Sequence, residues 1–362
     1  MFLIYSLLLM GLIYGYVEWR LISLLTCSFN AKIVLSILLF PSIFNLWVVI
    51  FLGESCPPVF LKLLSLLQVL LIYLFTATFI LDMIRLAHYV PNYVSNIVLV
   101  SCICLSIYSV WNASQEPRVK NVELETSFFE KETTPLKIVQ LSDLHIGQGF
   151  DGKWLQKVIE KTNALNPDVI VITGDLIDKD PEELGETMKL LLDLKSKFGT
   201  YIVFGNHEYY HNPSEWMRFY QKINLPVLTN TNTTLMHEGK TIVLSGIDFG
   251  ARYDQSKADK LLDKIYNKVD DDSLKILLAH HPAVYKKVKE RNVFLQLSGH
   301  THGGMIFPVD MIVALSNKGF LRGLYKNKNS NLYVSNGTGL WGGFPARFAS
   351  FNEITQIIIK GK

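Results

Sequence analysis

The first third of the chain consists of long apolar stretches, whereas the rest alternates short apolar runs with polar segments. Four stretches approach the ~20 residues that a helix needs to cross ~30 Å of hydrocarbon. They are residues 1–19, 33–53, 61–79 and 93–111. The first lacks the basic start of a cleaved signal peptide, because no Lys or Arg precedes Arg20. We therefore predict a transmembrane domain of four helices over residues 1–112.

A proline lies inside one of these stretches, and two charged residues lie between the third and the fourth. Pro41 lies inside the second one, where neighbouring groups must satisfy the carbonyl that a proline leaves without a partner. Asp82 and Arg85 lie one helical turn apart, which favours an ion pair at a helix end. The alternative is that these charges contact a lipid headgroup or a substrate, as intramembrane charges often do.

The pattern changes at about Asn112. Residues 113–135 are polar and contain two prolines, which is typical of a linker that leads into an edge strand. From residue 136 onward, short β-branched apolar runs end at polar residues, which indicates buried strands. These runs are LKIVQLSDLH, PDVIVITGDLID, TYIVFGNHEYY, LKILLAHHP and VFLQLSGHTH.

Helical spacing separates the first three runs. The segments DGKWLQKVIEKTNALN and PEELGETMKLLLDLKSK both predict amphipathic helices, so we expect a β-α-β-α-β order. Asp143 and Asp175 are 32 residues apart, and Asp175 and Asn206 are 31 apart, close to the ~30 residues of one crossover. Parallel strands bring their carboxyl ends to one edge of the sheet, where such folds bind ligands. We expect the following polar residues to converge there: Asp143, His145, Asp175, Asn206, His280, His300 and His302.

This set of side chains predicts metal binding. Two carboxylates, one amide oxygen and four imidazoles exceed the needs of one tetrahedral zinc site, and a carboxylate can bridge two ions. Two ions ~3.5–4 Å apart can activate water and hold a phosphoryl oxygen. A single aspartate of this kind could instead cap a helix, and a single Gly-Asn could form a tight turn. Five strand-end motifs in order favour a binuclear site, whose donors suit manganese, iron or zinc alike.

The same motifs carry a family resemblance. DLH, GDLID, GNHE, the His-x-Pro of HHP, and GHTH occur in this order between Leu136 and Ile306. In this order they resemble the motifs of calcineurin-like metallophosphoesterases, and GLYKNKNSNLYVSNGTGLWGG is similar to the bacterial membrane-linked branch of that family. The resemblance implies an α/β/β/α sandwich over residues 136–362, behind the four helices.

The resemblance also implies a role for each of the seven residues. One metal ion would be held by Asp143, His145 and His302. The other would be held by Asn206, His280 and His300, with Asp175 bridging both ions.

Three neighbouring residues would act beside the metal ligands. His207 would face the leaving-group oxygen as a general acid or hydrogen-bond donor rather than bind metal. Asp178 and Glu208 would orient imidazoles or backbone groups.

Two further stretches are candidates for shaping the site. Gly299, Gly303 and Gly304 would let both imidazoles of GHTH turn inward and would accept backbone angles that a β-carbon forbids. Similar family members carry Gln where this chain has Met305, so one polar substrate contact of the family is absent here. In GLWGGFPARF, Trp341 could contact a substrate and Arg347 could clamp a phosphate with two hydrogen bonds. The alternative for this stretch is a surface loop closed by an aromatic plug.

Charge and cysteine content exclude several function classes. Only 7 of the 67 charged side chains (35 basic plus 32 acidic) precede residue 113, which leaves 31 basic and 29 acidic ones downstream. That balance lacks the basic stripe of a nucleic-acid-binding protein. All four cysteines lie in the apolar part, so the downstream domain has no thiol nucleophile. With both chain ends on the cytoplasmic side, the basic residues flanking the spans tie at three on each side of the membrane, which does not set the orientation.

We therefore predict an integral protein of the cell membrane that hydrolyses phosphoesters with two divalent ions. A membrane anchor offers nothing obvious to an enzyme of soluble substrates, so we expect a phosphodiester or pyrophosphate of a lipid or cell-envelope substrate. UDP-diacylglucosamine pyrophosphatases are one similar activity. For the catalytic domain we lean to the extracytoplasmic side. The alternatives are a phosphoprotein or phosphomonoester phosphatase, and a metal-binding membrane sensor without turnover; the oligomeric state stays open.

Overall fold

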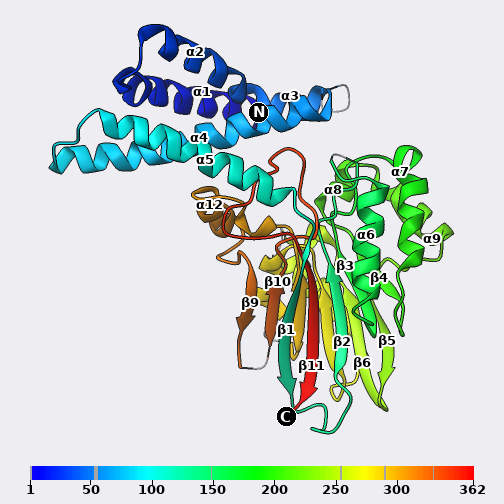
Figure 1. Cartoon of the computed structure of the whole chain (residues 1–362). Helices are drawn as coiled ribbons and strands as arrows, with labels where there is room; N and C mark the ends of the chain where they lie inside the picture. The colour runs from blue at the N-terminus through cyan, green and yellow to red at the C-terminus, as the bar shows by residue number, and fades with distance from the viewer. Residues whose placement is uncertain (1, 53–55, 148, 253–254, 289–290, 329) are drawn as a thin grey trace. The chain divides into compact units, whose positions relative to one another are not determined.

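The structure is a computed structural model that describes residues 2–52, 56–147, 149–252, 255–288, 291–328 and 330–362. The chain forms two compact units, which are both drawn in Figure 1. The first, here called the helical unit, comprises Met1–Gln115, Met305–Pro308 and Trp341–Ala349. The second, called the sheet unit, comprises Glu116–Gly304, Val309–Leu340 and Ser350–Lys362. The predicted domain division at residues 112 and 113 therefore lies three residues from the observed one, but two later segments change unit.

The helical unit contains the predicted apolar helices. They are α1 (Phe2–Arg20), α2 (Phe29–Leu39), α3 (Asn45–Leu52), α4 (Pro58–Ala87) and α5 (Tyr93–Ala113). By length and composition, four segments could cross a membrane: Leu3–Leu24, Phe29–Leu52, Val59–Ala87 and Tyr93–Ala113. The four predicted spans are thus confirmed at this level, while their predicted ends at Met1 and Gly53 lie outside the residues that the structure describes.

Pro41 divides the second span. A short 3₁₀ helix, η2 (Phe40–Phe44), joins α2 to α3 at this point, because proline has no amide hydrogen with which to continue an α-helix. The Ser42 hydroxyl donates to the Leu39 carbonyl oxygen at 2.6 Å. The side chain of Asn45 reaches Gln68 of α4 at 2.5 Å. Polar groups from the span and from a neighbouring helix therefore stabilise the break.

Asp82 is the centre of a polar network within the helical unit. Its carboxylate accepts from Arg20 at 2.7 and 3.0 Å, and from the Tyr16 hydroxyl at 2.7 Å. Arg85 donates to Asp82 at 3.2 Å and to the Ser95 hydroxyl at 3.1 Å. The predicted pair between Asp82 and Arg85 is confirmed, and it belongs to a larger network that joins α1, α4 and α5.

Two segments from the second half of the chain pack with these helices. In the segment Trp341–Ala349, the Arg347 amide donates to the Ser109 carbonyl at 2.9 Å, and the Asn112 side chain donates to the Arg347 carbonyl at 2.9 Å. The Phe348 amide donates to the carbonyl of Met305 at 3.0 Å, which ties the two segments together. Both segments therefore pack in the helical unit, and the assignment of residues 136–362 to one phosphoesterase domain stays a prediction.

The sheet unit is built on two sheets. The first has the strand order β1 (Arg118–Thr126), β11 (Glu353–Gly361), β2 (Leu136–Leu141), β3 (Val169–Thr173) and β4 (Thr200–Val203). The second has the order β5 (Thr231–His237), β6 (Lys240–Gly246), β7 (Leu274–Leu278), β8 (Leu295–Ser298), β10 (Asn331–Val334) and β9 (Gly323–Lys326). The helices of this unit are α6 (Gly152–Asn163), α7 (Pro181–Met188), α8 (Asn206–Tyr210), α9 (Pro213–Lys222), α10 (Gln255–Tyr266), α11 (Tyr285–Val288) and α12 (Val309–Ser316).

Alternating side chains arrange these elements in four layers. Ile138 of β2 and Ile276 of β7 share one buried cluster, which fills the space between the sheets. On the opposite face of β2, Val139 packs in a second cluster with Leu155 of α6. A third cluster joins the other face of β7 to α10 and α11. Helices α6, α7 and α9 lie together beside the strands in Figure 1, and the predicted α/β/β/α sandwich is confirmed.

The strand pattern gave one expectation that is wrong. Strands β2, β3 and β4 are parallel neighbours, joined through α6 and α7 as predicted. However, β7 and β8 are parallel neighbours in the second sheet. The antiparallel hairpin of β5 and β6 interrupts the repeated crossovers and starts that sheet. The polar strand ends therefore meet from two sheets and not along one sheet edge.

Candidate metal centre

Five of the predicted metal ligands have an unusual backbone conformation. Asp143, His145, Asp175, His300 and His302 have φ values of 53°, 48°, 53°, 73° and 48°. Side chains other than glycine rarely occupy this left-handed region, which costs about 1–3 kcal/mol per residue and is concentrated at functional sites. The ends of β2, β3 and β8 thus turn their polar residues toward a common point at the expense of local stability.

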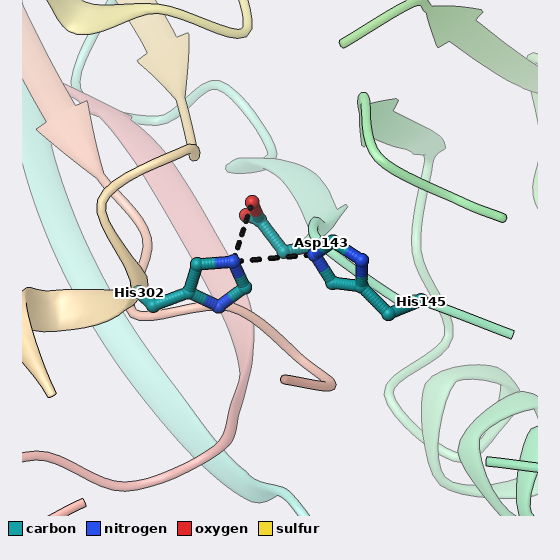
Figure 2. Close-up of side chains that lie close together, drawn as sticks. All are labelled: Asp143, His145 and His302. Atoms are coloured by element: carbon teal, nitrogen blue, oxygen red, sulfur yellow. Dashed lines mark hydrogen bonds and ion pairs between the residues drawn. The ribbon is translucent and has the colours of Figure 1, made fainter. Parts of the chain in front are cut away.

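The first group of ligands consists of Asp143, His145 and His302, whose potential ligand atoms lie within 4.8 Å of one another. Figure 2 shows the three side chains facing each other. The Nε2 atoms of His145 and His302 are 3.2 Å apart, and His302 Nε2 is 3.6 Å from Asp143 Oδ1. The structure therefore brings together residues that are 157 positions apart in the chain.

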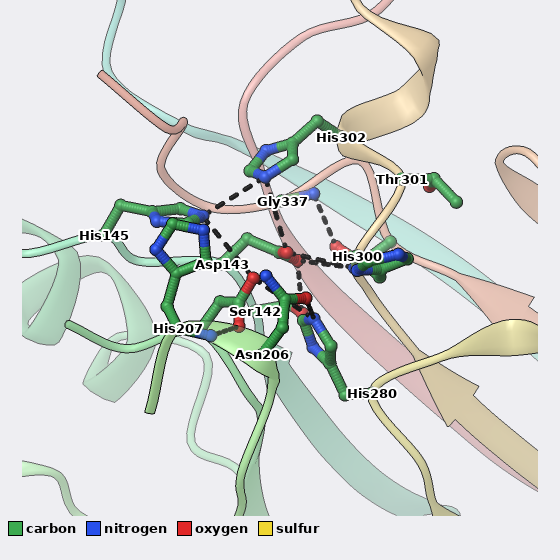
Figure 3. Close-up of polar contacts among 12 residues, drawn as sticks. Ser142, Asp143, His145, Asn206, His207, His280, His300, Thr301, His302 and Gly337 are labelled. Atoms are coloured by element: carbon green, nitrogen blue, oxygen red, sulfur yellow. Dashed lines mark hydrogen bonds and ion pairs between the residues drawn. The ribbon is translucent and has the colours of Figure 1, made fainter. Parts of the chain in front are cut away.

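The second group consists of Asp175, His280 and His300, again within 4.8 Å, and Asn206 adjoins it. His280 Nε2 lies 3.2 Å from Asp175 Oδ2 and 3.3 Å from Asn206 Oδ1. Asp175 Oδ2 is also 3.9 Å from His145 Nε2 of the first group. Asp175 thus lies between the two groups, and all seven predicted ligands form a single cluster. Figure 3 labels six of the seven, namely Asp143, His145, Asn206, His280, His300 and His302.

The donor chemistry of this cluster fits divalent cations. His145 Nδ1 is 2.8 Å from the Asp178 carboxylate, and His280 Nδ1 is 2.7 Å from the Thr173 carbonyl oxygen. Both oxygens only accept, so each ring donates from Nδ1 and turns Nε2 toward the cluster. For His280, Nε2 faces the oxygens of Asp175 and Asn206. These oxygens favour a cation at that point, whether a proton on Nε2 or a metal ion bound to it.

Electrostatics favour positive charge at the same place. Burial alone would lower the pKa of His280, but the Asp175 and Asp143 carboxylates outweigh burial and raise it to about 9. Burial raises the pKa of Asp143, where the nearby carboxylate of Asp175 adds to the increase. The carboxylates that favour a proton on His280 would favour a metal ion in the same way.

Asp178 joins the metal cluster to His207. Its Oδ1 atom lies 2.8 Å from His145 Nδ1 and 2.6 Å from His207 Nδ1. Burial opposes the charge on Asp178, but the two imidazoles hold the pKa of that carboxyl well below its usual value. Burial would also lower the pKa of His207, yet the Asp175 and Asp178 carboxylates raise it to about 9. His207 also lies within 4.8 Å of His145 and Asp175, so its role as a donor and not a ligand stays a prediction.

Glu208 orients backbone groups. Its carboxylate accepts from the amides of Gly205 at 2.6 Å, Asp175 at 3.0 Å and Leu176 at 2.6 Å. These bonds fix the turn that presents Asp175 and close the first turn of α8, which begins at Asn206. Of the two orienting residues, Asp178 therefore contacts imidazoles and Glu208 contacts backbone.

Sequence reasoning missed a buried chain of hydrogen bonds that ends on a metal ligand. The Gln140 side chain donates to Thr173 Oγ1 at 2.8 Å, and Thr173 Oγ1 donates to Ser142 Oγ at 2.8 Å. Ser142 Oγ then donates to Asp143 Oδ2 at 2.6 Å. Gln140 also reaches the Ser298 carbonyl of the second sheet at 2.9 Å. The only sequence signal for this chain was polar residues within otherwise apolar strands.

The glycines in and directly after GHTH have different structural roles. Gly303 and Gly304 have φ values of 62° and 82°, as the prediction required. Gly299 is needed for space, because a side chain there would collide with Ser142 Oγ and the Asp143 carboxylate. In HHP, His281 lies outside the ligand set and accepts from the Ala283 amide at 3.1 Å, which caps a 3₁₀ turn.

Trp341 and Arg347, the predicted substrate contacts, belong to the helical unit. Arg347 is 0% exposed there, and its backbone is hydrogen-bonded to α5. Arg347 is therefore packed within this unit, and contact of either residue with a substrate stays a prediction.

Known proteins resemble this chain. The family model described as calcineurin-like phosphoesterase matches residues 136–304. A metallophosphoesterase of Campylobacter jejuni is 37% identical over 72% of this chain and 69% of its own length. A transmembrane protein with metallophosphoesterase domain from Danio rerio is 34% identical over 73% of this chain and 62% of its own length.

One solved structure gives only a loose similarity in fold. A putative 5'-nucleotidase from Staphylococcus aureus aligns with a TM-score of 0.40 and 12% identity, over 57% of this chain and 49% of that one. The sequence relatives and the ligand cluster both indicate a metallophosphoesterase. The chain belongs to the calcineurin-like metallophosphoesterase family, as a metal-dependent phosphoester hydrolase with four candidate membrane spans.

Proposed function

We propose that the enzyme hydrolyses a phosphodiester or pyrophosphate bond in a lipid or cell-envelope substrate. Chain connectivity is the observation that carries this proposal. Two segments of the helical unit, Met305–Pro308 and Trp341–Ala349, begin close to the metal ligands in the chain. Met305 lies three positions after His302. Trp341 lies two positions after Gly339, whose amide donates to the Asp143 carbonyl at 3.0 Å. The loops that carry or support metal ligands thus continue directly into segments that pack with the apolar helices.

Two divalent ions are part of the proposal. One set of ligands for them is Asp143, His145 and His302, the other is Asn206, His280 and His300, and Asp175 is shared. When bound, such ions activate water and stabilise the charge on phosphoryl oxygens. The His145 and His280 rings are held in the required tautomer by Asp178 and by the Thr173 carbonyl.

His207 supplies the proton for the leaving group in this proposal. Burial would lower the pKa of His207, but the Asp175 and Asp178 carboxylates raise it, which favours the protonated ring that this role requires. His207 Nδ1 lies 2.6 Å from the Asp178 carboxylate, whose charge attracts the proton on that nitrogen, so the proton on Nε2 is the one passed to the leaving oxygen. Asp178 stabilises the imidazolium before the transfer and orients the ring.

The experiment compares substrates and variants of the full chain in lipid nanodiscs. An aryl phosphodiester, the matching monoester, a glycerophosphodiester lipid and a lipid pyrophosphate are offered with manganese and after chelation. Asp175→Asn and His207→Ala are expected to abolish turnover, and Asp193→Asn, at an exposed position, serves as the matched control. We expect the diester or pyrophosphate to be preferred and a lipid substrate to be turned over fastest.

The other outcomes select the alternatives. Preference for the monoester with no turnover of either lipid would favour a phosphomonoester or phosphoprotein phosphatase. Binding of metal with no turnover of any substrate would favour a sensor. Either result would reject the proposed substrate class.

A further inference from the structure

Helix α12 (Val309–Ser316) presents a large apolar surface to its surroundings. Six of its eight residues are apolar, and none of the eight, all within the described range 291–328, is buried. Met311, Ile312 and Leu315 are 57%, 63% and 78% exposed. Residues at i, i+1 and i+4 lie within a ~100° arc of a helix, so the three side chains share one face.

The longer helices α6 and α9 of the sheet unit bury large apolar side chains. Helix α6 buries Leu155, Val158 and Ile159 against the first sheet, and α9 buries Trp216 and Tyr220. Helix α12 differs from them, and exposed apolar surfaces of this kind mark binding to a membrane or a partner.

The position of α12 in the chain favours the membrane. The helix begins directly after Met305–Pro308, a segment that belongs to the unit with four candidate spans. Phe307 of that segment is exposed as well. Helix α12 also contacts the metal-ligand loop, by which we mean residues 299–304 with His300 and His302. Gly304 of this loop lies close to Asp310 of α12: a β-carbon at Gly304 would be 2.9 Å from Asp310 Cα. The apolar face is thus continuous along the chain with a membrane attachment.

Charge near α12 favours an anionic lipid surface. From residue 309 to 328 the chain has one acidic residue, Asp310, and four basic ones: Lys318, Arg322, Lys326 and Lys328. Arg322 is partly engaged, because it donates to the Gly303 carbonyl at 2.7 Å, while Lys318, Lys326 and Lys328 are exposed. Apolar side chains beside basic ones are the composition of helices that lie in a bilayer interface.

We propose that α12 is an interfacial helix, which inserts Met311, Ile312 and Leu315 into an anionic bilayer and holds the metal-ligand loop at the lipid surface. The occupant of the apolar face is therefore lipid, and not a second copy of the chain or another protein. The role of this contact in catalysis rests on the proposed function, but the insertion itself does not require turnover.

Spin-label accessibility tests the insertion. The full chain, with Cys27, Cys56, Cys102 and Cys104 replaced by serine or alanine, receives a label at Leu315→Cys and is placed in nanodiscs with phosphatidylglycerol. Leu192→Cys is the matched control, since Leu192 is 53% exposed in the sheet unit far from α12 in sequence. Relative to the control, we expect a several-fold higher ratio of collisions with oxygen to collisions with a water-soluble nickel chelate at position 315.

Two results would overturn the proposal. A ratio equal to that of the control means that α12 faces water. A label shielded from both oxygen and nickel means that protein covers the helix. If the chain without native cysteines does not fold, a photoactivatable phosphatidylglycerol is used with the wild-type chain. Adducts are expected on residues 309–316 and not on residues 189–193, and the opposite distribution rejects insertion.

A kinetic arm tests the role of the contact separately. Leu315→Ser is expected to lower turnover of a membrane-embedded substrate several-fold and to leave a soluble aryl phosphodiester unaffected, whereas Leu192→Ser changes neither. Equal rates for Leu315→Ser and the wild type on the embedded substrate would reject the role of α12 in catalysis. If the wild type turns over no lipid at all, the proposed function fails while the accessibility result still decides the insertion.

Discussion

The helical unit and the sheet unit both bury a carboxylate, but they surround it with opposite partners. Around Asp82 in the helical unit, the contacts are donors: Arg20, Arg85 and the Tyr16 hydroxyl. These groups balance the charge with the chain's own atoms, and the network joins three helices.

Around Asp175 in the sheet unit, the partners are imidazole nitrogens. His280 Nε2 is 3.2 Å away and His145 Nε2 is 3.9 Å away, while the other nitrogen of each ring already donates elsewhere. The carboxylates and imidazoles converge on one region, where a metal ion could replace the protons. Positive φ values at five of its residues, Asp175 among them, add a local cost that a structural network would not require. The Asp82 network thus indicates a structural role, and the metal-binding side chains that converge on a strained backbone indicate a binding site.

The largest expected effect comes from removing the shared ligand. Asp175→Asn keeps the shape of the side chain but removes the charge that both ligand groups share. We expect kcat/KM for a phosphodiester to fall about 10³-fold or more, because metal ions supply several kcal/mol of transition-state stabilisation. The circular dichroism spectrum is expected to stay unchanged. Activity within tenfold of the wild type would remove Asp175 from its central role.

The corresponding change in the helical unit is expected to affect stability alone. Asp82→Asn removes the negative charge that faces Arg20 and Arg85, and the loss of one partner destabilises a partly buried ion pair. Thermal unfolding in detergent is expected to shift to lower temperature, with metal content and kcat at permissive temperature as in the wild type. Loss of bound metal in this variant would contradict the distinction between the two carboxylates.

A smaller effect on activity is expected at Asp178. Asp178→Asn can still accept one hydrogen bond but no longer places a negative charge beside His145 and His207. Groups that orient metal ligands typically contribute 10–100-fold to activity or metal affinity. We expect a decrease of that size in kcat/KM and in manganese affinity, relative to Asp193→Asn. An unchanged affinity together with unchanged kcat/KM would show that neither imidazole depends on Asp178.

The smallest effect is expected at an exposed carboxylate. Lys161 and Lys157 lower the pKa of Glu116 from 4.5 to about 2. Because the pKa is depressed in the folded state, the stabilisation is complete above pH 4.5 and is lost as the pH falls toward 2. Glu116→Gln should therefore lower the melting temperature slightly at pH 7, less at pH 3.5, and less in high salt. An effect that grows as the pH falls would have the wrong sign.

Local patterns were sufficient to predict the spans and the ligand strands. Apolar stretches of membrane-spanning length are visible in sequence, and each ligand motif directly follows a buried strand, as in LKIVQLSDLH before Asp143 and His145. The chain order of the motifs then limited where those residues could meet. For this reason the seven ligand candidates could be named before their geometry was known.

Long-range pairing explains what the patterns could not predict. Strand β5, TNTTLMH, has no continuous apolar run, so the start of the second sheet was not visible. The loop Trp341–Ala349 has the glycine and aromatic content of a substrate loop, yet its packing depends on partners such as the Ser109 carbonyl, more than 200 residues away in the chain. Likewise, nothing in the sequence predicts that the Ser142 hydroxyl donates to the Asp143 carboxylate.

The most direct test of the central claim is the number of metal ions bound by the full-length protein. Inductively coupled plasma mass spectrometry would be applied to wild type, Asp175→Asn and Asp82→Asn after equilibration with manganese. We predict two ions per chain in the wild type and in Asp82→Asn, and fewer than two in Asp175→Asn. One ion or none in the wild type, or an Asp175→Asn protein that still binds two, would contradict a binuclear centre at the strand ends.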